Sequence, residues 1–147
     1  MQKLFQMLVQ ILIKIVMLFI LIIINYWVLI FQGFCYLMKI FFLLYFAVLI
    51  WSAINPKDYF TWFLEVIPAI IALIVLALTY RKFKLTTLIY SLILIHCIIL
   101  MIGGHYTYAQ VPLFDFIKEV FNQERNNYDK VGHLAQGFVP AMIAREI

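Results

Sequence analysis

The chain has 147 residues, of which 67% are hydrophobic and only 12% are charged, and its mean hydropathy is +1.04. Soluble domains are nearer half apolar, so this composition excludes an ordinary soluble domain. The net charge of +4 comes from Lys and Arg at the ends of apolar segments and forms no basic stripe, which argues against a nucleic-acid partner.

The apolar segments indicate the fold class. They are continuous runs of roughly 18 to 25 residues, the length at which an α-helix crosses about 30 Å of hydrocarbon. They do not alternate between polar and apolar residues, as membrane-spanning strands do. The sequence therefore predicts an all-α, polytopic helical membrane protein with about five spans, one interfacial amphipathic helix and the lipid bilayer as its surroundings.

The first apolar block, residues 4–34, is too long for one ordinary crossing. We expect an interfacial start up to Lys14 and a first span over residues 15–31. Gln32 and Gly33 predict a short break, and a second span follows over residues 36–54.

The second span ends in a turn, because Pro56 disfavours helix at Asn55 and Asp58 can cap the helix that follows. The third span, residues 59–80, contains Glu65 and then Pro68. Proline removes a backbone donor, so a kink or local widening is expected near Glu65.

A dense positive cluster of Arg81, Lys82 and Lys84 precedes the fourth span, residues 85–102. Gly103-Gly104 predicts the end of that span just before His105. In the connecting segment, residues 112–123 read as an amphipathic helix with Pro112 at its first position, lying in the membrane interface. A fifth span begins near Asp129 and runs to the end of the chain.

Several motifs between residues 45 and 147 resemble those of a known family. They are Trp51-Ser52-Ala53-Ile54-Asn55-Pro56, Thr61-Trp62-Phe63-Leu64-Glu65, Gly103-Gly104-His105-Tyr106-Thr107-Tyr108, Val111-Pro112-Leu113-Phe114-Asp115, and residues 127–140 extended to Ala144-Arg145-Glu146. Together they resemble the YjdF-like family of bacterial inner-membrane proteins, which has no assigned biochemical function. The sequence has no internal repeat and no low-complexity linker, so we expect one membrane domain over residues 1–147. Because the family continues past Glu146 with further spans, we also expect a chain truncated at its C-terminus.

Asp129, His133 and Gln136 form the polar stripe that we consider the best candidate for chemistry. Their spacing places them on one face of a helix. One turn apart, Asp129 can orient the His133 imidazole and raise its proton affinity, as in acid–base or relay pairs. Alternatively, Asp129 only caps the helix, while His133 and Gln136 bond a neighbouring helix.

Four further polar side chains are candidates, because ionisable groups in hydrocarbon are costly unless they face protein or water. Glu65 and His96 lie in predicted spans, and His105 and Tyr106 lie at the exit of the fourth span. That exit and the start of the fifth span share one membrane side, so His105 can approach Asp129 and His133. The three residues would meet the ligand count of a metal site, yet no H-x-x-H, H-E-x-x-H or C-x-x-C spacing appears. We therefore expect no metal and no cofactor.

Three functions remain open from the sequence. The first is a polar intramembrane pocket that binds a small ligand or carries protons or solutes. The second is a membrane-embedded enzyme acting on a lipid or lipid-linked head group, with catalytic residues among His133, Asp129 and His105 and ligand contacts from Gln136, Glu65, His96 and Tyr106. The third is a structural or assembly subunit, in which the stripe binds a partner helix or a second copy.

Overall fold

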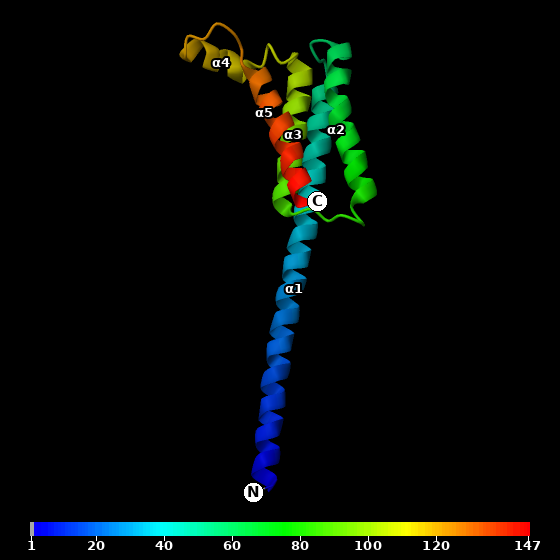
Figure 1. The fold of residues 1–147 in the computed structure, drawn as a ribbon, viewed down its shortest axis with the longest axis vertical. Helices are drawn as coiled ribbons and strands as arrows, with labels where there is room; N and C mark the ends of the chain where they lie inside the picture. The colour runs from blue at the N-terminus through cyan, green and yellow to red at the C-terminus, as the bar shows by residue number, and fades with distance from the viewer. Residues whose placement is uncertain (1) are drawn as a thin grey trace. The chain divides into compact units, whose positions relative to one another are not determined.

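The computed structural model describes residues 2–147, and their side-chain surroundings from Lys14 onward, except at Trp27 and Phe31. Every regular element in that part of the chain is a helix (Figure 1). The helices are α1 (Gln2–Ala53), α2 (Tyr59–Thr79), α3 (Thr87–Tyr106), α4 (Pro112–Val120) and α5 (Tyr128–Glu146). The chain divides into two compact units, Met1–Ile40 and Phe41–Ile147, and the candidate site lies wholly in the second.

The helix α1 is continuous over 52 residues, so the predicted break at Gln32-Gly33 is wrong. A single glycine costs a helix only about 1 kcal/mol, and no proline or turn-forming cluster is present there to end it. The apolar side chains that precede the glycine, such as Ile15, Leu18 and Phe19, are largely exposed, as on a helix surrounded by lipid. The interfacial start expected before Lys14 concerns side chains outside the described residues.

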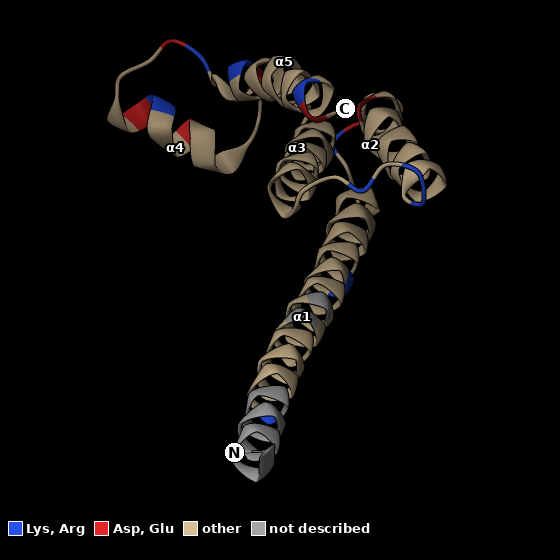
Figure 2. Ribbon diagram, turned by 60° about the horizontal axis from the view of Figure 1, so that its bottom comes forward, with Lys and Arg blue, Asp and Glu red and all other residues tan. Residues whose placement is uncertain are grey.

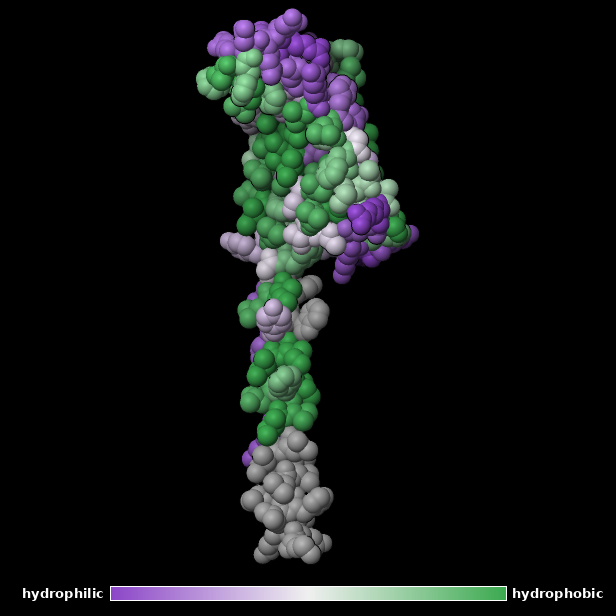
Figure 3. All heavy atoms as spheres, turned by 60° about the vertical axis from the view of Figure 1, so that its left-hand side comes forward, coloured by the Kyte–Doolittle hydropathy of each residue, from purple (hydrophilic) through white to green (hydrophobic). Residues whose placement is uncertain are grey.

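Three helical segments of the described chain are long and apolar enough to cross a membrane: Lys14–Ala53, Tyr59–Thr79 and Thr87–Tyr106. The predicted polytopic helical class is confirmed, although the first two predicted spans form one helix. The fifth predicted span, α5, is not among the three. On the face of the second unit drawn in Figure 3, hydrophobic side chains form a band, and hydrophilic ones gather at the end where Figure 1 places α4.

The turn before α2 follows the prediction. Asn55 adopts a left-handed conformation with φ of 53°, and Asp58 caps the helix by accepting the Thr61 backbone N–H at 2.7 Å. Hydrogen bonds from the Thr61 side chain and backbone lower the pKa of the exposed Asp58 carboxyl. The helix then continues through Pro68.

The helix α3 is longer than predicted, because it continues through Gly103-Gly104 and ends only at Tyr106. The two glycines lie inside the helix and serve close packing. A Cβ at Gly104 would lie 3.2 Å from Cβ of Glu65 and 3.4 Å from Cα of Trp62. The turn out of the helix is made instead by Thr107 and Tyr108, with φ of 54° and 59°.

The centre of the second unit is α3, which packs against both α2 and α5. The buried core includes Val66 and Ala69 from α2, Ile89, Cys97 and Met101 from α3, and Val139 from α5. At the far end from α4, the Glu146 carboxylate accepts hydrogen bonds from the backbone and hydroxyl of Thr86, the N-cap of α3. The last turn of α5 is thereby attached to the first turn of α3.

The predicted amphipathic helix is present as α4, three residues shorter than expected, with charged side chains of both signs (Figure 2).

Candidate functional site

A polar cavity of about 470 Å³ lies over α3, between α2 and α5. Its walls come from three helices and the turn after α3. The lining residues are Glu65 and Pro68 of α2, His96 and Leu100 of α3, Thr107 and Tyr108 of the turn, and Asp129, Gly132, His133 and Gln136 of α5. Five of the residues singled out from the sequence, Glu65, His96, Asp129, His133 and Gln136, therefore share one cavity.

The Tyr108 ring is part of the lining of this cavity. It lies between two glycines of different helices. A Cβ at Gly103 would be 2.4 Å from Cζ of the ring, and a Cβ at Gly132 would be 2.9 Å from Cε1. Any larger residue at these positions would collide with the ring.

The Tyr108 hydroxyl shares the cavity with the carboxylate of Glu65. Burial, and then the negative charge of Glu65, raise the pKa of Tyr108 above its ordinary value, so the phenol stays protonated. Glu65 itself is only partly buried and lies on the first half of α2. It brings a carboxylate from α2 to the cavity that α5 also lines.

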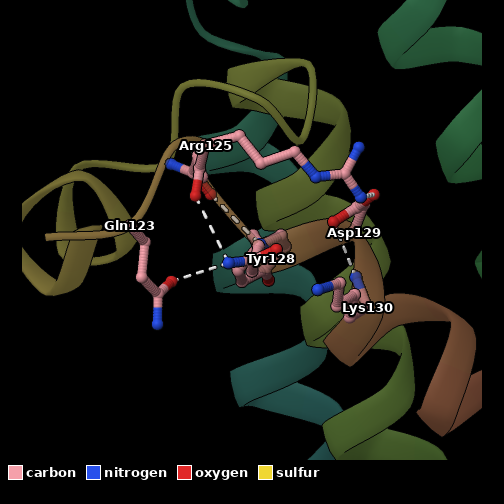
Figure 4. A network of polar contacts seen from close by, with 7 residues as sticks. Gln123, Arg125, Tyr128, Asp129 and Lys130 are labelled. Atoms are coloured by element: carbon pink, nitrogen blue, oxygen red, sulfur yellow. Dashed lines mark hydrogen bonds and ion pairs between the residues drawn. The ribbon is translucent and has the colours of Figure 1, made fainter. Parts of the chain in front are cut away.

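The Asp129 carboxylate is held at the start of α5 by two contacts (Figure 4). Its Oδ2 accepts a hydrogen bond from the Arg125 guanidinium at 3.0 Å, and its Oδ1 accepts the Lys130 backbone N–H at 2.9 Å. Neither of these bonds goes to His133, so this carboxylate does not orient the imidazole as an acid–base pair would require. The side chains of Arg125 and Asp129 are 65% and 36% exposed, which places the ion pair at the mouth of the cavity.

His133 and Gln136 are exposed and line the α5 wall. Pro140 sits inside α5, one turn further on. A proline has no backbone N–H, so the carbonyl of Gln136 loses its usual intrahelical donor. The side chains of this wall offer an imidazole and an amide to the cavity.

His96 supplies the polar atom at the floor of the cavity. Its Nε2 is buried, and it is the one such atom among the described side chains that has no hydrogen-bond partner. A buried polar atom without a partner costs about 1–3 kcal/mol, so native proteins rarely leave one. The cavity therefore contains a buried nitrogen that a bound group could bond.

His105 and Tyr106 lie outside the cavity, so the predicted approach of His105 to Asp129 and His133 is not found. The His105 Nδ1 is 3.0 Å from the backbone oxygen of Ser52, and the ring stacks on Trp51 at a centroid distance of 4.7 Å. Because a carbonyl only accepts, Nδ1 carries the proton. Tyr106 packs against the same His105 ring, edge to face, at 4.6 Å.

Ser52 completes this second polar cluster. Its side chain is fully buried, donates to the Leu49 carbonyl at 2.9 Å and accepts from the Trp62 Nε1–H at 3.2 Å. The cluster ties the end of α1, the start of α2 and the end of α3 together. These contacts hold His105 in this cluster and away from the cavity.

The charge of the cavity is one-sided. Two of its lining residues, Glu65 and Asp129, carry carboxylates, and none of the described residues that line it is a lysine or arginine. No group of three or more His, Cys, Asp and Glu side chains in the described chain is arranged to hold a metal ion. The cavity is therefore an acidic, hydrogen-bonding site.

Residues 36–147 match the family model described as "Predicted membrane protein (DUF2238)". The chain belongs to this family. A curated relative, Inner membrane protein YjdF of Escherichia coli strain K12, is 50% identical over 100 residues, which cover 68% of this chain and 48% of the relative. No solved structure matches the chain. The resemblance drawn from the sequence motifs is thus confirmed, and this DUF2238 protein is an integral protein of the inner membrane.

All the residues that line the cavity lie within the part that matches the DUF2238 model. The chain spans about half the length of the curated relative, 48%.

The sequence did not single out Tyr108 and Thr107 as lining residues, although both belong to the motif that begins at Gly103. Two small residues next to each other in a membrane helix, followed by an aromatic residue, are the pattern that would have pointed to a ring packed against the glycines.

Proposed function

We propose that this membrane protein binds a small cationic ligand, such as a protonated amine, in the cavity between α2, α3 and α5. The single observation that carries the proposal is the composition of the lining: two carboxylates, two imidazoles, an amide and two hydroxyls, without a lysine or arginine among the described residues. A cleft lined by one sign of charge with low-dielectric walls attracts the opposite charge.

Size supports the same proposal. Ligand pockets usually measure about 300–1,000 Å³ and combine apolar walls with a few convergent polar groups. The cavity of about 470 Å³ fits this description, with Pro68 and Leu100 beside the polar side chains. Glu65 would provide the counter-charge, and His133 and Gln136 would accept hydrogen bonds from an ammonium group.

The two carboxylates differ in whether a cationic side chain of the protein already pairs with them, and this difference decides which one would bind the ligand more strongly. Asp129 is already neutralised in part by Arg125 at the mouth of the cavity. Glu65 has no such cationic partner among the ion pairs of the described residues, and it is half-buried in the cavity wall. We assign Glu65 as the main anionic contact of the ligand.

The test is the thermal stability of the purified protein in micelles at constant ionic strength, with ethanolamine as the cationic probe. Ethylene glycol and acetate serve as neutral and anionic probes of similar size. A ligand that binds only the folded state stabilises it by RT ln(1 + [L]/Kd), so ethanolamine should raise the unfolding temperature in a saturable way. The other two probes should not.

The matched variants are Glu65→Gln and Glu124→Gln, which change the net charge equally. Glu124 is exposed and does not line the cavity. Glu65→Gln should abolish the stabilisation by ethanolamine, and Glu124→Gln should leave it unchanged. Equal stabilisation by acetate, or an ethanolamine response that survives in Glu65→Gln, would reject the proposal.

A further inference from the structure

An apolar groove continues from the polar cavity along the same three helices. Its volume is about 580 Å³, and it begins where the polar cavity ends, because Pro68, His96 and Leu100 line both. Beyond those residues the groove is lined almost entirely by apolar side chains, among them Ala72 and Val75 of α2, Ile93 of α3, and Val139 and Ile143 of α5.

The polar cavity and the apolar groove lie one after the other along α2 and α5. Along α5, the polar cavity uses Asp129 to Gln136, and the groove uses Val139 to Ile147. Along α2, the polar cavity uses Glu65 and Pro68, and the groove runs on to Thr79. The apolar part is therefore roughly 12 Å long by the helical rise over residues 139–147.

We infer that the ligand is amphiphilic: an apolar chain lies in the α2–α3–α5 groove, and its amine head lies in the polar cavity beside Glu65. This inference rests on the proposed function and adds the chemical class of the ligand.

His96 is the observation that links the two hollows. It lines both of them, and its buried Nε2 is without a partner in the described chain. In an amphiphile, the atoms between chain and head are commonly a hydroxyl, ester or amide. Such a group would sit at His96 and give the nitrogen its hydrogen bond, whereas a hydrocarbon segment of a second protein would leave it unsatisfied.

The surroundings of the groove favour a lipid-like chain over a peptide. The same helices expose large apolar side chains outside the groove, among them Ile74 and Leu78 of α2 and Ile95 of α3. These surfaces contact the acyl chains of the bilayer, so a hydrocarbon chain can enter the groove sideways without crossing water. An extended peptide in the same place would leave its backbone groups without hydrogen-bond partners, which hydrocarbon does not tolerate.

The experiment uses the full chain in lipid nanodiscs with a trace of a photoreactive probe. The probe is a long-chain alkylamine with a diazirine half-way along its chain, and the control is the carboxylic acid with the same chain. After irradiation, the labelled residues are mapped by peptide mass spectrometry. The amine should label the groove residues of α2, α3 and α5 in preference to the exposed faces of the same helices, and excess unlabelled alkylamine should remove this labelling.

Groove-filling variants give the matched control. Ala72 lines the groove, whereas Ala77 on the same helix is exposed and lines neither hollow. Ala72→Phe should reduce groove labelling to the level left by excess competitor, and Ala77→Phe should leave it unchanged. Should Ala72→Phe fail to fold, Val75→Trp, at a half-exposed position in the same wall, fills the groove instead.

The outcomes separate the amphiphilic ligand in the groove from the cationic pocket beside Glu65. Labelling that is uniform, or that is identical for the amine and the acid, overturns the amphiphile, even where ethanolamine still stabilises the protein through Glu65. A covalent dimer bridged through the groove would assign the groove to a second copy and also overturn it. If ethanolamine does not stabilise the wild-type protein, the cationic pocket itself is rejected.

Discussion

Replacing Gly103 by alanine tests the packing that forms the cavity. The new Cβ would lie 2.4 Å from Cζ of Tyr108, and 2.6 and 2.7 Å from Cε2 and Cε1. Carbon atoms prefer separations of about 3.5–4.0 Å, so the ring would need to move by about 1 Å or more. Gly132 closes the other side, where a Cβ would be 2.9 Å from the ring.

The size of the effect follows from two opposing contributions. Overpacking of a filled site costs about 1–3 kcal/mol. Alanine in a helix interior gains about 1 kcal/mol over glycine. The ring has contact on both sides, so we expect a cost near the upper end and a net destabilisation of about 1–2 kcal/mol.

The assay is the free energy of unfolding in micelles, measured for a double-mutant cycle with Tyr108→Ala. In the Tyr108→Ala background the collision is gone, so Gly103→Ala should be neutral or stabilising. The coupling energy should be about 2–3 kcal/mol, at the upper end for residues in direct contact. Gly137→Ala is the matched control, because nothing lies within 4 Å of a Cβ there, and it should stabilise by about 1 kcal/mol.

Two results would refute this reasoning. One is an equal cost of Gly103→Ala with and without the Tyr108 ring, which would show that the ring does not fill the space beside the glycine. The other is a stabilisation by Gly103→Ala as large as that by Gly137→Ala.

Three further predictions concern the polar contacts around the cavity. Ser52→Ala should destabilise the protein by about 1–3 kcal/mol in equilibrium unfolding, because the Trp62 Nε1–H loses its acceptor inside the protein. Glu146→Ala should cost about 0.5–2 kcal/mol, as the loss of a helix cap does, and hydrogen exchange of the Thr86 amide should accelerate. The raised pKa of Tyr108 predicts a stability that is complete below pH about 10, the ordinary phenol value, and that is lost as the pH rises toward the folded-state pKa; Tyr108→Phe should make the alkaline decline shallower in a pH series of unfolding curves.

The fold class and most helix positions followed from the sequence because they depend on local physics. A continuous apolar run sets the span, and Asp58 caps α2 through its own neighbours in the chain. The break at Gln32-Gly33 and the end of α3 at Gly103 were predicted wrongly for the same reason. Glycine was read as a breaker, although a helix in a membrane has no water to replace its backbone hydrogen bonds.

The candidate site was only partly predictable. The helical stripe of Asp129, His133 and Gln136 indicated one wall, and their spacing is a property of α5 alone. That Glu65 and His96 complete the cavity, and that His105 does not, depends on how α2, α3 and α5 pack. The deciding contacts are Gly104 against Trp62 and His105 against Ser52, and neither pair is close in sequence.

Accessibility to a cationic thiol reagent tests the central claim, an open polar cavity along α5, most directly. In a background with Cys35 and Cys97 replaced by alanine, a cysteine is placed at Gln136, which lines the cavity, or at Leu134, which is 72% exposed and does not line it. A thiol in hydrocarbon stays protonated and unreactive. We predict that a trimethylammonium methanethiosulfonate modifies Gln136→Cys quickly and Leu134→Cys slowly, and that ethanolamine protects the former. Equal rates at the two positions, without protection, would contradict the cavity and with it the function proposed here.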